Sequence, residues 1–251
     1  DYFHDPRLRQ LFGRYATYCG SSPFLAPATL MLVAHVEQEG VWLVEGGMHR
    51  LAVALERLAT RLGARFRYQT EASEILVRGG RIAGVALTSG ERLEVDAIVA
   101  NADVAALAAG RFGQAVAGAV PPAPVSARSL SALTWALHAE PQGFPLARHT
   151  VFFSNDYAAE FDDIFQRGRL PAGPTVYVCA QDRDDHGEGA PAGPERLFCL
   201  VNAPPTGDRH PFAAPEIEEC EQRTFGLLAR CGLHLDRQPE NMVVTTPAQF
   251  E

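Results

Sequence analysis

The sequence has 251 residues, of which 47% are hydrophobic and 21% are charged, a composition typical of a folded globular protein with one or two domains. Its formal net charge of −8 argues against the basic surface that nucleic-acid binding requires, so we expect no nucleic-acid partner. All 22 cationic side chains are arginine, which excludes reactions that depend on a lysine, such as Schiff-base formation and P-loop phosphate binding.

The N-terminal segment has helical patterns. Apolar residues recur at helical spacing from Pro6 to Cys19 and the pattern stops at Gly20, while a second helix is expected within residues 26–36. The apolar stretch from Phe24 to Val36 is shorter than the roughly 20 residues that a membrane-spanning helix needs. We therefore expect no transmembrane helix here.

A strand, a glycine turn and a helix follow in close succession. Residues 41–44 predict a short strand that ends at Gly46 and Gly47. Leucines at helical spacing predict a helix from Met48 to Leu62, with Gly63 at the position of a C-terminal cap.

The next segment alternates between apolar and polar residues, as strands do. A strand is expected at residues 65–68, and Gly-Gly and Ser-Gly turns then separate three strands of an antiparallel meander. Residues 96–101 form an apolar run with a polar end, which predicts a buried strand that delivers a loop to a site.

The proline-rich residues 121–124 predict a connection between domains. Beyond them, an amphipathic helix is expected at residues 215–233, and four runs are expected to be strands: residues 129–139, 150–154, 175–180 and 197–203. Strands separated by long excursions predict a mixed or antiparallel sheet with helices on one side. The predicted fold class is mixed α/β.

The residues alone identify no catalytic group and no metal site. The eight histidines lack the spacing of metal ligands with nearby cysteines or glutamates, and no Gly-x-Ser-x-Gly motif is present. The catalytic residues therefore remain unknown at this level.

Several segments resemble bacterial phytoene-desaturase-type flavoproteins, in the order that this family has them. The likeness covers nearly the whole chain and is carried by residues 18–28, 40–48, 62–63, 70–76, 99–103, 149–157, 170–171 and 175–179. It implies a partial FAD-binding domain of the Rossmann type together with a substrate domain. We expect residues 1–40 to form substrate-domain helices, residues 41–120 to form the returning part of the FAD domain, and residues 121–251 to form the substrate domain.

The resemblance implies an enzyme that uses FAD to desaturate a carotenoid. In this family the segment that matches residues 70–75 passes the adenine end of FAD, and Ala72 here takes a place usually held by valine. The loop of Ala100, Asn101 and Ala102 matches the one that returns near the cofactor, although both features can also reflect fold connectivity alone. The family's Gly-rich phosphate loop is absent from this sequence, so we expect this chain by itself to bind FAD weakly or not at all and to be inactive.

A carotenoid substrate has almost no polar groups and needs a long apolar tunnel. The side chains expected to line the tunnel, each of which can instead belong to an ordinary core, are Phe24, Leu25, Met31, Trp135, Phe152, Phe153 and Tyr177. Members of this family are peripheral membrane proteins, which implies a cytoplasmic protein at the inner membrane with residues 24–36 as its contact.

Within the family, the overall likeness is greatest to the hydroxy- or methoxyneurosporene desaturases of purple photosynthetic bacteria, which act on acyclic carotenoids modified at C-1. Three alternatives remain open at this point. They are a phytoene desaturase, an amine oxidase on the same fold, and a non-catalytic binding module that has lost the cofactor.

Overall fold

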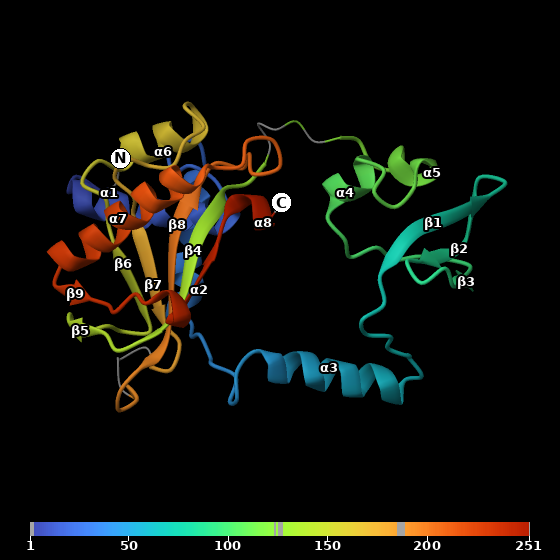
Figure 1. Ribbon diagram of the computed structural model, residues 1–251, viewed down its shortest axis with the longest axis horizontal. Helices are drawn as coiled ribbons and strands as arrows, with labels where there is room; N and C mark the ends of the chain where they lie inside the picture. Colours follow the sequence, from blue (N-terminus) through green and yellow to red (C-terminus); the bar gives the residue numbers. More distant parts are fainter. Residues whose placement is uncertain (1–2, 123, 125–127, 185–188, 251) are drawn as a thin grey trace. The chain divides into compact units, whose positions relative to one another are not determined.

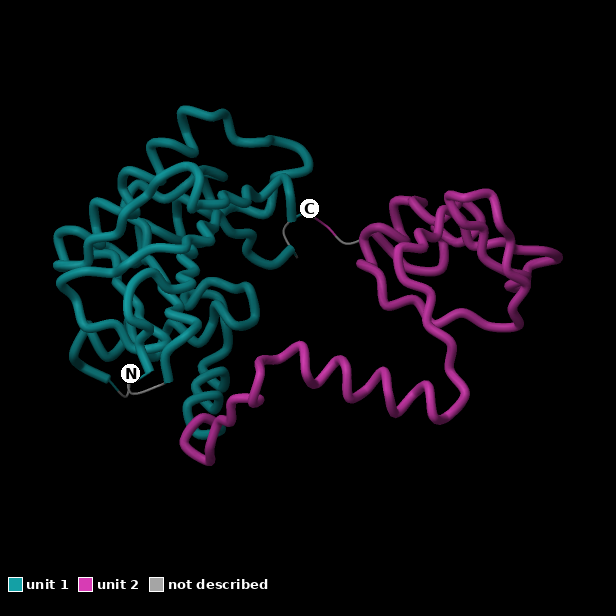
Figure 2. Tube along the Cα trace, turned by 60° about the horizontal axis from the view of Figure 1, so that its bottom comes forward, with its two compact units in different colours: residues 1–36, 128–251 teal, residues 37–127 magenta. Residues whose placement is uncertain are grey.

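The computed structural model describes residues 3–122, 124, 128–184 and 189–250. The chain divides into two compact units, one formed by residues 1–36 and 128–251 and the other by residues 37–127 (Figure 2). The first unit is built from two segments that are distant in the sequence. Each unit is described separately below.

A five-stranded sheet is the centre of the first unit (Figure 1). Its strands lie in the order β10-β4-β8-β7-β6, and every neighbouring pair is antiparallel. Their bounds are β4 (Ser131–Ala139), β6 (His149–Phe152), β7 (Val176–Ala180), β8 (Glu195–Ala203) and β10 (Met242–Thr245). The four long strands expected beyond residue 124 are confirmed, whereas β10 and the small pair β5 (Gln142–Gly143) and β9 (Leu233–His234) were not anticipated.

The long helix α7 (Ala214–Arg230) packs on one face of this sheet (Figure 1). The Glu216 carboxylate accepts a hydrogen bond from the backbone N–H of Ala213, 2.9 Å away, and so caps the helix start. Cys220, Phe225 and Leu228 on its inner side are buried against the strands. This packing forms the hydrophobic core of the unit.

Shorter helices complete the first unit: α1 (Pro6–Gly13), the 3₁₀ helices η1 (Arg14–Cys19) and η2 (Ala28–Met31), α2 (Leu32–Gln38), α6 (Tyr157–Phe165), η4 (Pro239–Asn241) and α8 (Pro247–Phe250). The helix expected from Pro6 to Cys19 is confirmed, with its second half tightened into η1. Gly20 ends it with a φ of 61°, a left-handed conformation that glycine adopts without a steric penalty. No helix in the described part of the chain is long and apolar enough to cross a membrane.

The second unit contains the helix α3 (His49–Arg61), an antiparallel meander and two short helices. The meander is formed by β1 (Ala72–Arg78), β2 (Arg81–Leu87) and β3 (Arg92–Glu94), and the helices are α4 (Val104–Ala108) and α5 (Gln114–Ala117). The expected helix and meander are confirmed. The two short helices lie in an Ala- and Gly-rich region that gave no helical signal.

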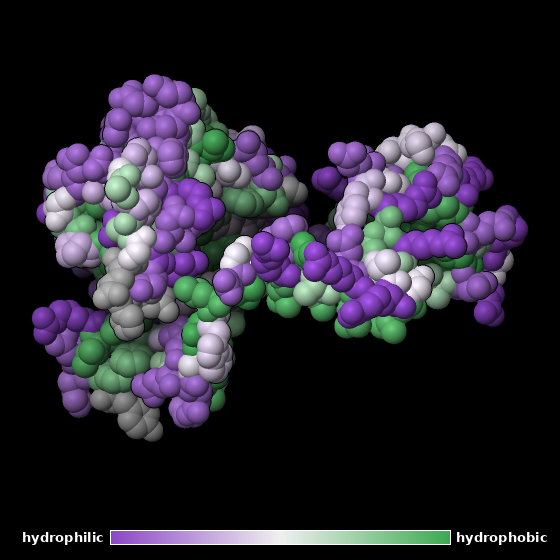
Figure 3. Space-filling model, turned by 90° about the horizontal axis from the view of Figure 1, so that it is seen from below, coloured by the Kyte–Doolittle hydropathy of each residue, from purple (hydrophilic) through white to green (hydrophobic). Residues whose placement is uncertain are grey.

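Helix α3 is amphipathic but buries none of its side chains. Its apolar stripe consists of Leu51, Leu55, Leu58 and Leu62, and Leu62 is 80% exposed. Figure 3 shows apolar side chains gathered along one side of this helix and hydrophilic ones along the other. An apolar stripe of this kind is typical of a helix face that packs against another element. No described segment of this chain buries it.

The prediction of three further strands in the second unit is wrong. Residues 41–44, 65–68 and 96–101 have no strand hydrogen bonding, and the side chains of Trp42 and Val99 are 81% and 97% exposed. An apolar run becomes a strand only when another strand pairs with it. No described segment of this chain pairs with these three runs.

Candidate functional site

The two faces of the five-stranded sheet differ in burial. Successive side chains of a strand point to opposite faces, and the register pairs Trp135 and Val178 with Cys199, so these three side chains share one face. All three are 0% exposed in the core beneath α7. The opposite face carries the half-buried side chains of Val151, Tyr177, Phe198 and Leu200. We call these four residues the open face.

The seven predicted tunnel residues do not line one surface. Trp135 and Phe152 are core residues: the Trp135 indole N–H donates to a Glu221 carboxylate oxygen at 3.1 Å, and the Phe152 ring meets Phe144 edge-on at 5.0 Å. Tyr177 belongs to the open face, where its hydroxyl is 2.8 Å from the Nδ1 atom of His149. The structure therefore separates core members from residues that a ligand can reach.

An aromatic cluster brings two of the predicted residues together. The Tyr157 ring lies 6.5 Å from the ring of Phe24 and 6.0 Å from the ring of Phe153, and Phe161 contacts both Tyr157 and Phe24. Phe24 and Phe153, far apart in the sequence, thus meet at α6. Leu25 is mostly exposed and Met31 is half-buried, and neither belongs to this cluster.

A buried carboxyl group lies beside this cluster. Glu160 is only 1% exposed, and one of its oxygens accepts a hydrogen bond of 2.6 Å from the Thr175 hydroxyl, which in turn accepts one from the backbone N–H of Ser154. Burial raises the pKa of Glu160 to about 7, although Thr175, the charge of Arg14 and the amide of Asn202 each act to lower it. Glu160 therefore titrates near neutral pH.

The same surroundings act on the hydroxyl of Tyr157. Burial raises the pKa of Tyr157 to about 12, against the opposing effect of the Arg14 charge. Burial also raises the pKa of Tyr177, and Arg14 again opposes this shift. The guanidinium of Arg14 is therefore close to Glu160, to Tyr157 and to the open face.

These polar residues were missed at the level of sequence, although a signal for them exists. Asp156 precedes α6 and its carboxylate accepts a hydrogen bond from the N–H of Ala159 at 3.0 Å, as a helix N-cap does. Tyr157, Phe161 and Ile164 then form an apolar stripe, and Glu160 falls on that stripe. A carboxylate on the apolar side of a capped helix indicates a buried polar site.

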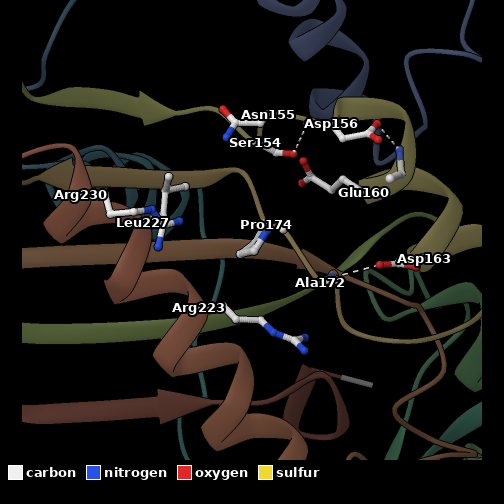
Figure 4. A pocket seen from close by; sticks show the side chains of 12 residues that line it. Ser154, Asn155, Asp156, Glu160, Asp163, Ala172, Pro174, Arg223, Leu227 and Arg230 are labelled. Atoms are coloured by element: carbon white, nitrogen blue, oxygen red, sulfur yellow. Dashed lines mark hydrogen bonds between the residues drawn. The ribbon is translucent and has the colours of Figure 1, made fainter.

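A pocket of about 500 Å³ opens on the other side of Glu160, between α6, residues 172–174 and α7 (Figure 4). Its walls include Asp156 and Asp163 on one side and Arg223 and Arg230 of α7 on the other. This lining is strongly charged, and none of the seven predicted tunnel residues belongs to it. The pocket therefore does not provide an apolar tunnel.

The residues expected to contact FAD lie in the second unit. Ala72 begins β1, and the loop of Ala100, Asn101 and Ala102 is exposed and precedes α4, which Asp103 caps by accepting a hydrogen bond from the N–H of Ala105 at 2.6 Å. Short side chains and an accessible backbone fit contact with a flat ring system through main-chain atoms.

Comparison with known proteins agrees with this architecture. Residues 1–135 match the family described as "Flavin containing amine oxidoreductase". The chain also resembles an oxidoreductase structure from Methanosarcina mazei with a TM-score of 0.56 over 94% of this chain and 52% of that one. At 15% identity this likeness supports the mixed α/β fold alone.

Curated relatives match all or most of the chain. It is 55% identical over 250 residues to the hydroxyneurosporene desaturase of Rubrivivax gelatinosus, covering 100% of this chain and 47% of that protein. The corresponding protein of Cereibacter sphaeroides is 45% identical, with coverage of 99% and 49%. A 1-hydroxycarotenoid 3,4-desaturase of a Flavobacterium species is 34% identical, with coverage of 80% and 41%.

The chain thus spans about half the length of the curated relatives that it matches. The expected resemblance to carotenoid desaturases is confirmed by these identities, and the family match covers more than half of the 251 residues. This chain belongs to the flavin-containing amine oxidoreductase family.

Proposed function

We propose that the complete gene product is an FAD-dependent desaturase of an acyclic carotenoid that carries a hydroxyl or methoxy group at C-1. The observation that carries this proposal is the 55% identity to a hydroxyneurosporene desaturase over the entire chain. Two further relatives, at 45% and 34% identity, have names that specify hydroxylated carotenoids. A phytoene desaturase, an amine oxidase and a non-catalytic module receive less support.

The open face of the sheet suits such a substrate. Val151, Tyr177, Phe198 and Leu200 present half-buried aliphatic and aromatic surface, and burying a polyene against it releases water from both partners. The aromatic cluster around Tyr157 extends this surface toward the N-terminal segment. Of the seven predicted tunnel residues, we retain Phe24, Phe153 and Tyr177 as substrate contacts.

The second unit would hold part of the FAD. Bound FAD supplies the oxidant that takes up the two hydrogens as a C–C single bond becomes a double bond. The backbone at Ala72 and at Ala100, Asn101 and Ala102 would contact its adenine end. Because the sequence lacks a Gly-rich phosphate loop, we expect this chain alone to bind FAD weakly and to be inactive.

We also propose that the protein acts at the surface of the inner membrane, on the cytoplasmic side. Phe24, Leu25, Leu32 and Val36 of the N-terminal segment are apolar side chains that are all more than half exposed. Insertion of such side chains into the interfacial region would give access to a substrate that is dissolved in the bilayer. A vesicle flotation assay of the complete gene product would detect this contact.

Product analysis tests the proposed reaction. The purified, flavin-containing gene product would be incubated with a C-1-hydroxylated acyclic carotenoid and, separately, with phytoene. We expect the hydroxylated substrate to yield a product that lacks two hydrogens and absorbs at longer wavelength, because its conjugated system is extended. Faster conversion of phytoene would favour the phytoene desaturase, and a protein that binds no flavin would favour the non-catalytic module.

A further inference from the structure

Five side chains form a row that crosses the whole five-stranded sheet. Each comes from a different strand, and the register pairs each one with the next, in the order Val243, Ala136, Phe198, Cys179 and His149. Residues that lie directly opposite each other on neighbouring strands point to the same face. Phe198 belongs to the open face, so all five side chains lie on that side. We call these five residues the cross-strand row.

The cross-strand row is accessible, and it is strongly polar at one end only. Val243, Ala136 and His149 are exposed, and Phe198 and Cys179 are half-buried. The first three residues of the row offer hydrocarbon surface, and a free thiol behaves as a small apolar group. His149 lies on β6, the edge strand of the sheet, and carries two ring nitrogens. The row therefore has an apolar length and one hydrogen-bonding end.

Tyr177 holds the imidazole of His149 in place. Its hydroxyl is 2.8 Å from Nδ1, and the two rings are stacked with their centroids 6.0 Å apart. The same hydroxyl interacts with the thiol of Cys179, and burial raises the pKa of Tyr177, so the hydroxyl keeps its proton. This proton is donated to Nδ1, because an imidazole nitrogen is a stronger acceptor than sulfur. Nε2 then carries the ring proton and is an N–H donor that a ligand on the exposed ring can reach.

The cross-strand row matches a linear apolar molecule with an oxygen near one end. Neighbouring strands lie about 4.8 Å apart, so the row extends over roughly 20 Å from β10 to β6. An extended hydrocarbon chain on the row covers its apolar side chains and brings one end to His149. A hydroxyl or an ether oxygen at that end accepts a hydrogen bond from Nε2–H. A purely hydrocarbon end would take water away from Nε2–H without replacing the hydrogen bond, which is unfavourable.

We infer that His149, positioned by Tyr177, binds the hydroxyl or ether oxygen near the end of an acyclic polyene and thereby selects substrates that carry this oxygen. The inference rests on the proposed function. It assigns His149 to binding and selectivity, with no part in the oxidation itself. No bond is made or broken at this subsite.

The test compares two substrates that differ only in the C-1 hydroxyl group, using the flavin-containing gene product. We expect His149→Leu to lower kcat/KM for the hydroxylated carotenoid by about tenfold or more, mainly through KM, while kcat/KM for the unsubstituted counterpart changes little. His149→Gln should retain part of the selectivity, because its amide N–H can take the place of Nε2–H. If the counterpart is not turned over, its inhibition constant replaces kcat/KM.

Tyr177→Phe tests the positioning role of the hydroxyl. The variant keeps the aromatic ring on the open face but leaves Nδ1 of His149 without its hydrogen-bond partner. We expect a smaller loss of kcat/KM than in His149→Leu, again confined to the hydroxylated substrate. Equal losses of kcat/KM for the two substrates in Tyr177→Phe would contradict this role.

His234→Leu is the matched control. His234 is also an exposed histidine on a strand, but its strand β9 pairs with β5 in a separate two-stranded sheet. This control should leave the ratio between the two substrates unchanged. Equal losses for both substrates in His149→Leu, or no loss for either, would overturn the inference. If the wild-type protein converts no acyclic carotenoid, the proposed function itself fails.

Discussion

At the scale of single residues, the ionisation of Glu160 links stability to pH. The folded protein retains the proton up to a pKa of about 7, whereas the unfolded chain releases it near the ordinary value of 4.5. The contribution of this group to the free energy of unfolding is therefore complete below pH 4.5 and is lost as the pH rises through 7. Above pH 7, the buried carboxylate is ionised and only the unfavourable cost of its burial remains.

Glu160→Gln should remove this pH dependence, because the amide keeps the size of the side chain and does not titrate. Between pH 5.5 and pH 8 we expect wild type to lose about 2 kcal/mol of unfolding free energy relative to the variant. Urea unfolding of both proteins at the two pH values measures the difference. Glu218→Gln, at an exposed position of α7, is the control and should follow wild type. A Glu160 variant that also follows wild type would contradict the buried titration.

At the scale of elements, Asp163 fixes the end of α6 to the segment that follows it. Its carboxylate is nearly fully buried, accepts a hydrogen bond from the N–H of Ala172 at 3.0 Å, and lies 2.6 Å from Arg167 and 2.8 Å from Arg169. Burial acts to raise the pKa of Asp163, but these hydrogen bonds outweigh it and the pKa is lowered. Asp163 thus helps to hold residues 166–172 in place next to the candidate site.

We expect Asp163→Asn to lower the free energy of unfolding by about 2–3 kcal/mol, since hydrogen bonds to a charged group are replaced by weaker ones. The neighbouring Asp162 is exposed, and Asp162→Asn should change stability by less than about 0.5 kcal/mol. Urea unfolding at pH 7 measures both. Equal effects of the two substitutions would show that the carboxylate of Asp163 has no special structural role.

The elements that could be predicted from the sequence are those whose pattern is local. The helix ending at Gly63, the meander with its glycine turns and the four long strands of the first unit all have a period that matches their structure. The helix α6 was missed because its cap and its apolar stripe fall within a short segment between two strands. The run at residues 96–101 was wrongly expected to be a strand, because strand formation depends on a pairing partner that local sequence does not reveal.

The candidate site depends even more on long-range information. The sequence identified Trp135 and Tyr177 as equivalent tunnel residues, but strand alternation and register place them on opposite faces of the sheet. The surroundings of Glu160 combine residues as distant in the sequence as Arg14 and Asn202. Such proximity is a property of the folded topology and not of any motif.

At the scale of the whole molecule, the exposed apolar stripe of α3 indicates a surface that is covered in the complete gene product. The side chains of Leu51, Leu55, Leu58 and Leu62 are all exposed in this structure. The curated relatives are about twice as long as the region that this chain matches. We expect the remainder of the FAD-binding domain to pack on this stripe. The three exposed runs that were expected to be strands would find their pairing partners in the same domain.

Leu55→Asp tests this expectation, because a charge in a buried apolar interface is unfavourable by several kcal/mol. In the complete gene product we expect the substitution to lower the flavin-to-protein ratio after purification, measured from the visible and ultraviolet absorbance. Thr60→Asp, on the opposite side of α3, is the control and should retain flavin. Undiminished flavin binding by the Leu55 variant would show that the stripe is exposed in the complete protein as well.

The proposed function is tested most directly by the reduction of bound flavin in a single turnover. The complete gene product, loaded with FAD and kept free of oxygen, would be mixed with a C-1-hydroxylated acyclic carotenoid while its visible absorption is recorded. Transfer of two hydrogens to the flavin predicts bleaching of the flavin band, with one new carbon–carbon double bond formed for each flavin reduced. A flavin band that persists in the presence of this substrate and is bleached by an amine would contradict the assignment as a carotenoid desaturase.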